Sequence, residues 1–210
     1  MGTSKEANLL ARWAELAGAQ ASAVGEELIG RYQEPHRRYH TVTHLAAMLG
    51  VIDDLAADAD DVDAVRYAAF FHDAVYAVDR HDNEERSADL AEEMLGSLGL
   101  AAELVDEVAR LVRLTATHAP ADDDRNGGVL CDADLAVLAA DEAGYAAYTA
   151  AVRQEYRHVP DELFRAGRTA VLQGLAQQPR LFRTPTARTR YEAAARANLA
   201  RELTTLTSTD

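Results

Sequence analysis

Apolar residues recur at intervals of three and four positions along most of the chain, and the alternation that marks β-strands is nearly absent. Alanine, leucine, glutamate and arginine, which favour helices, are abundant throughout. This pattern predicts helices separated by short breaks. The predicted helices lie near residues 5–17, 20–33, 42–57, 62–75, 83–98, 101–118, 133–140, 142–157, 160–177 and 187–204.

The breaks are short, polar and rich in glycine or proline, and none has the composition of a linker between two domains. The clearest flexible loop is predicted at 121–128, where the sequence is ADDDRNGG. We therefore predict one all-α domain over residues 1–210, a bundle of about ten helices. Its N-terminal helices at about 5–33 would pack on a core built from about 36–140, followed by C-terminal helices at about 142–204.

The acidic net charge of the chain limits the classes of molecule that are expected to bind it. The sequence carries a formal net charge of -14, so its surface repels nucleic-acid backbones and anionic membranes. We expect neither nucleic acid nor a membrane as a partner, and either a monomer or a homodimer. A small phosphate ester stays compatible with this charge, because a local cation can reverse the field inside one pocket.

The single cysteine, Cys131, excludes a disulfide within the chain and is typical of a reducing cytoplasm. The N-terminal sequence MGTSKEANLLARWAELAG lacks the apolar stretch of a signal peptide. No run of about 18 apolar residues exists to span a membrane. These features predict a cytoplasmic protein.

Histidine and aspartate side chains interrupt the apolar faces of two predicted helices. His44 lies on the same helical face as Met48, and His40 comes one turn earlier on that side. His72 lies on the apolar face of the helix predicted at 62–75, and Asp73 follows it. A single histidine of this kind is usually a hydrogen-bonded core residue, and Asp73 alone could be a helix-terminal acceptor.

Two later segments repeat the pattern. His118 ends the apolar stripe of the helix predicted at 101–118, and Asp132 and Asp134 lie inside an apolar run. Asp132 taken alone is typical of an N-cap for the helix predicted to begin at 133. Burying several imidazoles and carboxylates costs free energy unless they pair or bind a metal. The set therefore predicts a divalent metal site, with the ion's identity open among Mn, Mg, Fe, Co, Ni and Zn.

Several ordered motifs resemble those of one known family. They are RYHTVTHL, FFHDAVY followed by DNEERSA, TATH, CDADLAVL, YAAYTAAVRQEY and ARANLARE, and they span roughly residues 30–204. In this order they resemble the HD superfamily of metal-dependent phosphohydrolases, and within it a bacterial family of predicted HD phosphohydrolases of about this length. The resemblance implies an HD-type helical domain that binds a divalent metal ion.

The resemblance also implies which residues hold the metal: His44, His72, Asp73 and one late aspartate. Asp134 is preferred to Asp132, because the superfamily's alanine-aspartate-leucine pattern falls on residues 133–135. Helix geometry agrees that only one of the two can face the ion, since residues two apart point roughly 200° from one another. Asp132 would keep a capping role or support the ligands from outside.

Two further histidines have roles that the resemblance suggests and the residues leave open. His40 is spaced from His44 as in cyclic-nucleotide phosphodiesterases, distant relatives in which the first histidine protonates the leaving group; alternatively it hydrogen-bonds the helix start. His118 matches a position where many HD proteins have an additional histidine. It would contact the substrate phosphate or a second metal, or be a core residue.

The DNEERSA motif and two arginines complete the candidates. Asp82 and Glu85 have the spacing of a capping box, whereas Glu84 would lie near the metal-activated water. Arg153 and Arg168 recur in the later motifs, and each would either bind phosphate or form a structural ion pair.

The resemblance implies a phosphohydrolase in which metal-activated water attacks a small phosphate ester, with a nucleotide as the expected substrate. His40, Asp73 and Glu84 would be the catalytic residues. One alternative is a di-iron oxygenase on the same scaffold, which needs extra histidines such as His81 and His118. The other is a non-catalytic module that binds a nucleotide or a metal.

Overall fold

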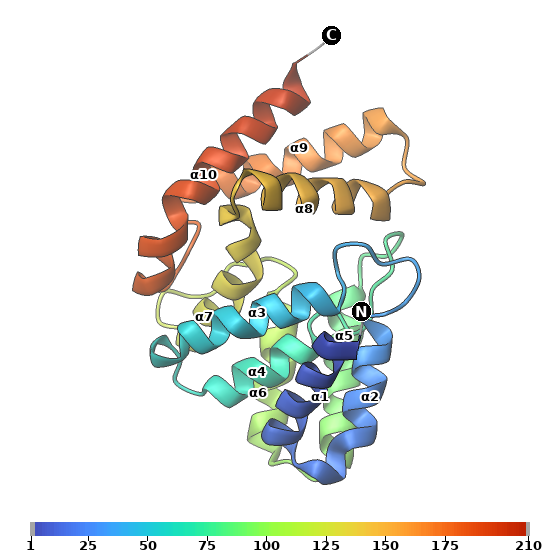
Figure 1. The fold of residues 1–210 in the computed structure, drawn as a ribbon. Helices are drawn as coiled ribbons and strands as arrows, with labels where there is room; N and C mark the ends of the chain where they lie inside the picture. Colours follow the sequence, from blue (N-terminus) through green and yellow to red (C-terminus); the bar gives the residue numbers. More distant parts are fainter. Residues whose placement is uncertain (1–2, 209–210) are drawn as a thin grey trace.

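The structure describes residues 3–208, and all regular secondary structure in that range is helical (Figure 1). This computed structural model contains, over those residues, ten α-helices and three short 3-10 helices and no β-strand. The all-α prediction is therefore confirmed. The elements are α1 (Thr3–Ala17), η1 (Ala19–Ala21), α2 (Ser22–Arg31), α3 (Val42–Asp54), η2 (Ala56–Asp58), α4 (Val62–Phe71), α5 (Asn83–Ser97), α6 (Ala102–Leu114), α7 (Arg125–Leu135), η3 (Ala136–Ala139), α8 (Glu142–Glu155), α9 (Asp161–Gln177) and α10 (Pro185–Thr207).

An aromatic core holds the N-terminal half together. The fully buried indole of Trp13 in α1 meets the rings of Tyr67, Phe70 and Phe71 edge-on, with centroids 5.1 to 6.1 Å away. Its Nε1 donates to the Ala21 carbonyl at 2.8 Å, so the one polar atom of the ring is satisfied. This packing fixes α4 against α1, and the end of α4 carries the histidine of the His-Asp pair.

The C-terminal helices form a second layer. In Figure 1, α8 and α9 lie above α3 and α7, and α10 packs against α9 and η3. Of the described helices, none is long and apolar enough to cross a membrane.

Asp132 connects the two layers, and its predicted role as an N-cap for a helix starting at 133 is wrong. It lies inside α7, fully buried, and accepts hydrogen bonds from the backbone N–H groups of Arg183 and Thr184, both at 2.7 Å. These residues come directly before α10. Asp132 therefore fixes the start of α10 against α7.

The predicted flexible loop at 121–128 is also wrong in its second half, because α7 begins at Arg125. Asp124 accepts a hydrogen bond from the backbone N–H of Gly127 at 2.9 Å and so caps the helix. A Cβ on Gly127 would lie 2.6 Å from a methyl carbon of Leu114. This glycine permits close packing of α7 on α6. The sequence pattern had suggested a flexible loop at this position instead.

The capping box predicted from Asp82 to Glu85 is not formed. Asp82 makes no capping hydrogen bond and instead pairs with Arg80, while Glu85 pairs with Arg113 at 2.9 Å. The loop before α5 is held by Asn83, whose side chain bonds both the backbone N–H and the carbonyl of Ala77. An amide that both donates and accepts replaces the expected carboxylate.

Candidate metal centre

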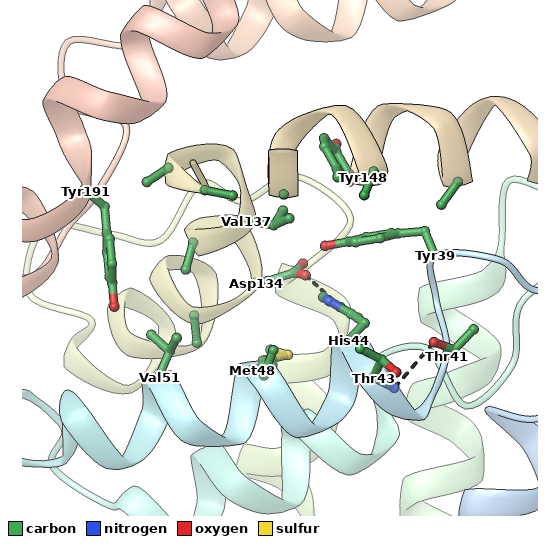
Figure 2. Close-up of a pocket in the computed structure, with 18 of the residues that line it drawn as sticks. Tyr39, Thr41, Thr43, His44, Met48, Val51, Asp134, Val137, Tyr148 and Tyr191 are labelled. Carbon is green, nitrogen blue, oxygen red and sulfur yellow. Dashed lines mark hydrogen bonds and ion pairs between the residues drawn. The ribbon is translucent and has the colours of Figure 1, made fainter. Parts of the chain in front are cut away.

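Three helices bring four candidate ligands to one point. His44 projects from the first turn of α3, whose start is capped by Thr41. His72 and Asp73 follow the last residue of α4, and Asp134 lies in the last turn of α7. Figure 2 shows His44 and Asp134 pointing toward one another from the two helices.

The distances between the ligand atoms fit a shared ion. His44 Nε2 lies 3.2 Å from His72 Nε2 and 3.2 Å from Asp134 Oδ1, and His72 Nε2 lies 3.0 Å from Asp73 Oδ2. Two further pairs, His44 with Asp73 and His72 with Asp134, are 3.9 and 4.0 Å apart. Ligands about 2.1 Å from one ion lie about 3.0 Å apart when adjacent and about 4.2 Å apart when opposite in octahedral coordination. His44, His72 and Asp134 together could hold a metal ion, and Asp73 lies beside them. We call these four residues the metal cluster.

The chemistry of the donor atoms also fits a cation. His72 Nδ1 lies 2.8 Å from the Ala69 carbonyl, which places a proton on Nδ1 and a lone pair on Nε2. That lone pair faces the Asp73 carboxylate and the second imidazole, so the neutral ring would meet only electron-rich atoms. Burial lowers the pKa of His72, but the Asp73 and Asp134 carboxylates outweigh it and raise the pKa to about 9. The field that attracts a proton here is the field that attracts a divalent cation.

His118 contacts the second carboxylate oxygen of Asp134. Its Nε2 lies 2.7 Å from Asp134 Oδ2, while Oδ1 of the same carboxylate faces His44. The predicted helix to residue 118 ends earlier, at Leu114, and His118 has a φ of 50°, in the left-handed region. Such a conformation is uncommon for histidine. The backbone thereby turns the ring onto Asp134.

A second buried group, which the sequence prediction did not include, is centred on Glu155 at the end of α8. One carboxylate oxygen accepts the backbone N–H groups of Arg38, Tyr39 and His40 at 2.7, 2.8 and 3.0 Å. The other lies 2.7 Å from His40 Nδ1 and accepts the Tyr76 hydroxyl at 3.1 Å. We call Glu155, His40, Tyr76 and this backbone the Glu155 cluster.

Electrostatics in the Glu155 cluster favour a charged pair. Burial raises the pKa of Glu155, but the hydrogen bond and charge of His40 and the backbone N–H groups lower it to about 2. Burial lowers the pKa of His40, whereas Asp73 and Glu155 raise it above its ordinary value. The His40 ring lies 5.9 Å from the His44 ring, centroid to centroid, and only its Nδ1 is occupied by Glu155. Its Nε2 makes no hydrogen bond with any residue between 3 and 208.

The sequence held one signal for Glu155. It shares the apolar stripe of α8 with Tyr145, Tyr148 and Val152, at spacings of three and four. Glu155 is only 4% exposed, and a carboxylate on a buried face requires a hydrogen-bonding or positively charged partner. That partner lies 115 to 117 residues away along the chain, which is beyond any local pattern.

Three predicted site residues lie outside both clusters. Glu84 is in the first turn of α5, and its carboxylate makes no hydrogen bond or ion pair with the residues that the structure describes. Arg153 pairs with Asp161 and lies over the Phe164 ring. Arg168 bonds Glu202 at 2.8 Å and the Tyr148 hydroxyl at 3.0 Å. Both arginines thus form structural ion pairs, and contact with a substrate stays a prediction.

Two cavities adjoin these clusters, and Tyr39 and Tyr148 line both. The first cavity, of about 570 Å³, is lined by His44 and Asp134 and by apolar residues of α3, α8 and η3 (Figure 2). The second cavity, of about 520 Å³, is lined by His40 and by residues of α8 and α9. The rings of Tyr39 and Tyr148 meet edge-on, 4.7 Å between centroids, where the two cavities adjoin.

Comparison of the chain with protein-family models, with curated proteins and with solved structures found no match. The resemblance to the HD superfamily therefore rests on the sequence motifs alone. The structure itself provides an all-helical fold and a buried histidine and aspartate group that could hold a metal ion.

Proposed function

We propose that the protein is a metal-dependent phosphohydrolase that acts on a small phosphate ester. The observation that carries the proposal is the position of the metal cluster beside His40, an imidazole held by a buried carboxylate. A site with open ligand atoms and an adjacent proton donor has the two components that hydrolysis of a phosphate ester needs.

The four residues of the metal cluster would hold the ion. When bound, a divalent cation lowers the pKa of a coordinated water and offsets phosphate charge. The Ala69 carbonyl keeps the lone pair of His72 Nε2 directed at the centre, and His118 keeps one oxygen of Asp134 directed there. Outer contacts of this kind fix the orientation of metal ligands.

His40 would act as the general acid. Its Nδ1 proton is bonded to Glu155, so the Nε2 proton of the imidazolium can pass to the oxygen of the leaving group. In the overall step a water oxygen forms a bond to phosphorus, the bond from phosphorus to the leaving oxygen breaks, and that oxygen takes the proton from His40. The water proton returns to solvent, from which His40 is protonated again.

The direct test measures metal content and phosphate release together. The purified protein is analysed for bound metal and then assayed on a panel of phosphate esters with added Mn, Mg, Co or Ni. We expect a bound divalent metal and metal-dependent release of phosphate, and we expect Asp73→Ala to lose both. The matched control is Asp106→Ala, which removes an exposed carboxylate on α6.

Three outcomes would contradict the proposal. An Asp73→Ala variant with full metal content and turnover would remove the assigned site. Bound iron with a mixed-valence EPR signal and no phosphate release would support the oxygenase alternative. Tight nucleotide binding without turnover with any of the metals would support a non-catalytic module.

A further inference from the structure

The second cavity, which His40 lines, is positioned to bind the leaving group of a substrate. A general acid must come within hydrogen-bond distance of the leaving oxygen. His40 lines the second cavity and not the first, whereas His44 and Asp134 line the first and not the second. A phosphate at the metal cluster with its leaving oxygen on His40 would therefore extend its leaving group into the second cavity.

The wall of this cavity is aromatic and aliphatic. Val152 and Val159 line it, and α9 adds Leu163 and Val171, the two large apolar side chains that are exposed among the described residues. Such a wall favours a flat apolar group. The aromatic side chains that line it are Tyr39, Tyr148, Tyr156 and Phe164.

The arginine in this wall already has a carboxylate partner. Arg168 is held by Glu202 through two hydrogen bonds, at 2.8 and 3.1 Å, and lies 5.0 Å from the centre of the Tyr148 ring. Breaking that ion pair to bind an anion would leave a carboxylate that is only 13% exposed without its partner. Apart from the imidazoles of His40 and His81, the cavity therefore offers a second phosphate no side chain that can carry a free positive charge.

Of three further arginines, Arg37 and Arg153 have carboxylate partners, whereas the Arg38 guanidinium bonds only backbone carbonyls. Arg37 is buried and pairs with Glu34 at 2.9 Å, and Arg153 pairs with Asp161. Arg38, which lines the first cavity, donates to the carbonyls of Pro35 and Arg37, both at 2.7 Å. A polyphosphate needs several positive groups, whereas one phosphate can be neutralised by a divalent cation and His40.

We propose that the second cavity binds the leaving group of a phosphomonoester, and that this group is an uncharged aromatic alcohol. This inference rests on the proposed phosphohydrolase function. The reaction consumes one water, releases inorganic phosphate and leaves the aromatic alcohol, with the proton of His40 on its oxygen, in the second cavity.

Gly167 provides a way to fill the cavity. It lies on α9 in the wall of the cavity, and a Cβ built there meets nothing within 4 Å. Gly167→Trp therefore adds an indole at the wall of the cavity, with a Cβ that meets no neighbour. The matched control is Gly174→Trp, two turns further along α9, where a Cβ also meets nothing within 4 Å and which lines neither of the two cavities. Both changes remove a helical glycine, which favours folding.

The experiment has a turnover arm and a binding arm. In manganese, we expect 1-naphthyl phosphate to be hydrolysed with a kcat/KM at least tenfold above that of ATP or glycerol 2-phosphate. Gly167→Trp should lower this kcat/KM at least tenfold and Gly174→Trp less than twofold. Isothermal calorimetry with 1-naphthol should show binding to the wild-type protein, weakened at least tenfold by Gly167→Trp alone.

The two arms separate the possible failures. If phosphate is released but ATP or glycerol 2-phosphate is preferred, or if both glycine variants behave alike, the assignment of the cavity is overturned while the phosphohydrolase function stands. If no ester is hydrolysed, the proposed function fails. In that case, binding of 1-naphthol to the wild-type protein and its loss in Gly167→Trp would still support an aromatic ligand for the cavity. If 1-naphthol does not bind the wild-type protein, the aromatic ligand is overturned as well.

Discussion

The metal cluster and the Glu155 cluster both place carboxylates and imidazoles in the interior, but they differ in how the chain satisfies them. The Glu155 carboxylate faces three backbone N–H groups, a hydroxyl and an imidazole, all of which the protein supplies. In the metal cluster, the Nε2 atoms of His44 and His72 face one another at 3.2 Å with two carboxylates around them.

A structural polar group and a ligand site differ in the number of donors that the chain supplies. A buried carboxylate costs little when donors from the chain surround it, because those hydrogen bonds replace water. A set of acceptors that converge with few donors between them is stable only with a proton or a cation at the centre. The first arrangement stabilises the fold, and the second requires something from outside the chain.

The largest expected effect comes from removing a ligand of the metal cluster. His72→Ala should weaken Mn²⁺ binding by about 100-fold or more, since one of the few strong donors is lost. Titration calorimetry measures this directly, and added Mn²⁺ should raise the Tm of the wild-type protein but not of the variant. His158→Ala, which removes an exposed histidine, is the control. Equal Mn²⁺ affinity in His72→Ala and His158→Ala would show that His72 is not a metal ligand and that the two clusters do not differ in this respect.

The next effect concerns the Glu155 cluster and should not depend on metal. Glu155→Ala leaves three backbone N–H groups without their acceptor, so the free energy of unfolding should fall by about 2 to 3 kcal/mol in EDTA. Urea denaturation measures the loss. Glu162→Ala, an exposed position on α9, should change it by no more than about 0.5 kcal/mol. If Glu155→Ala lowered the free energy of unfolding only when metal is present, the two clusters would act as one metal-dependent unit.

His118 should affect the metal cluster without belonging to it. His118→Asn keeps a residue that tolerates a positive φ but removes the contact with Asp134. Affinity for Mn²⁺ should fall by about 10-fold, as is usual when a support behind a ligand is lost. His118→Gly tests the backbone separately, since glycine adopts this φ freely. Unchanged affinity in both variants would show that Asp134 needs no support.

The smallest expected effect is a pH dependence. The pKa of Glu155 is about 2 in the folded protein and 4.5 for an unperturbed glutamate, so its contribution to stability is complete above pH 4.5 and is lost as pH falls through 2. Between pH 7 and pH 4 in EDTA this amounts to about 1 kcal/mol. Glu155→Gln, which cannot titrate, should have a shallower acid dependence in urea denaturation. Identical slopes would place the pKa of Glu155 near its ordinary value.

Two kinds of signal selected the four residues of the metal cluster from the sequence. Helical spacing put His44 and His72 on apolar faces, whereas Asp73 and the preference for Asp134 over Asp132 came from the resemblance to the HD superfamily. The structure brings Asp134 to the two histidines and leaves Asp132 at the start of α10. Local periodicity identifies residues such as His44 and His72, because the positions of a buried helical face recur at fixed spacings along the sequence.

Boundaries were predicted less well, because packing decides them. The sequence ADDDRNGG has the composition of a loop, yet Asp124 caps a helix there and Gly127 lets α7 approach α6 closely. Conversely, the helix predicted to reach His118 ends at Leu114, and His118 then turns onto Asp134. In both places a contact with a distant segment outweighs local preference.

The all-helical class and the two histidines on apolar faces could be predicted from spacings of three and four along single helices, and the two aspartates from the family resemblance. The packed structure was needed to show that Glu155 holds His40, that His118 holds Asp134 and that Asp132 fixes the start of α10. Those pairings join residues 16 to 115 positions apart. Their free energy depends on distances that exist only once the helices have packed, so no local pattern encodes them.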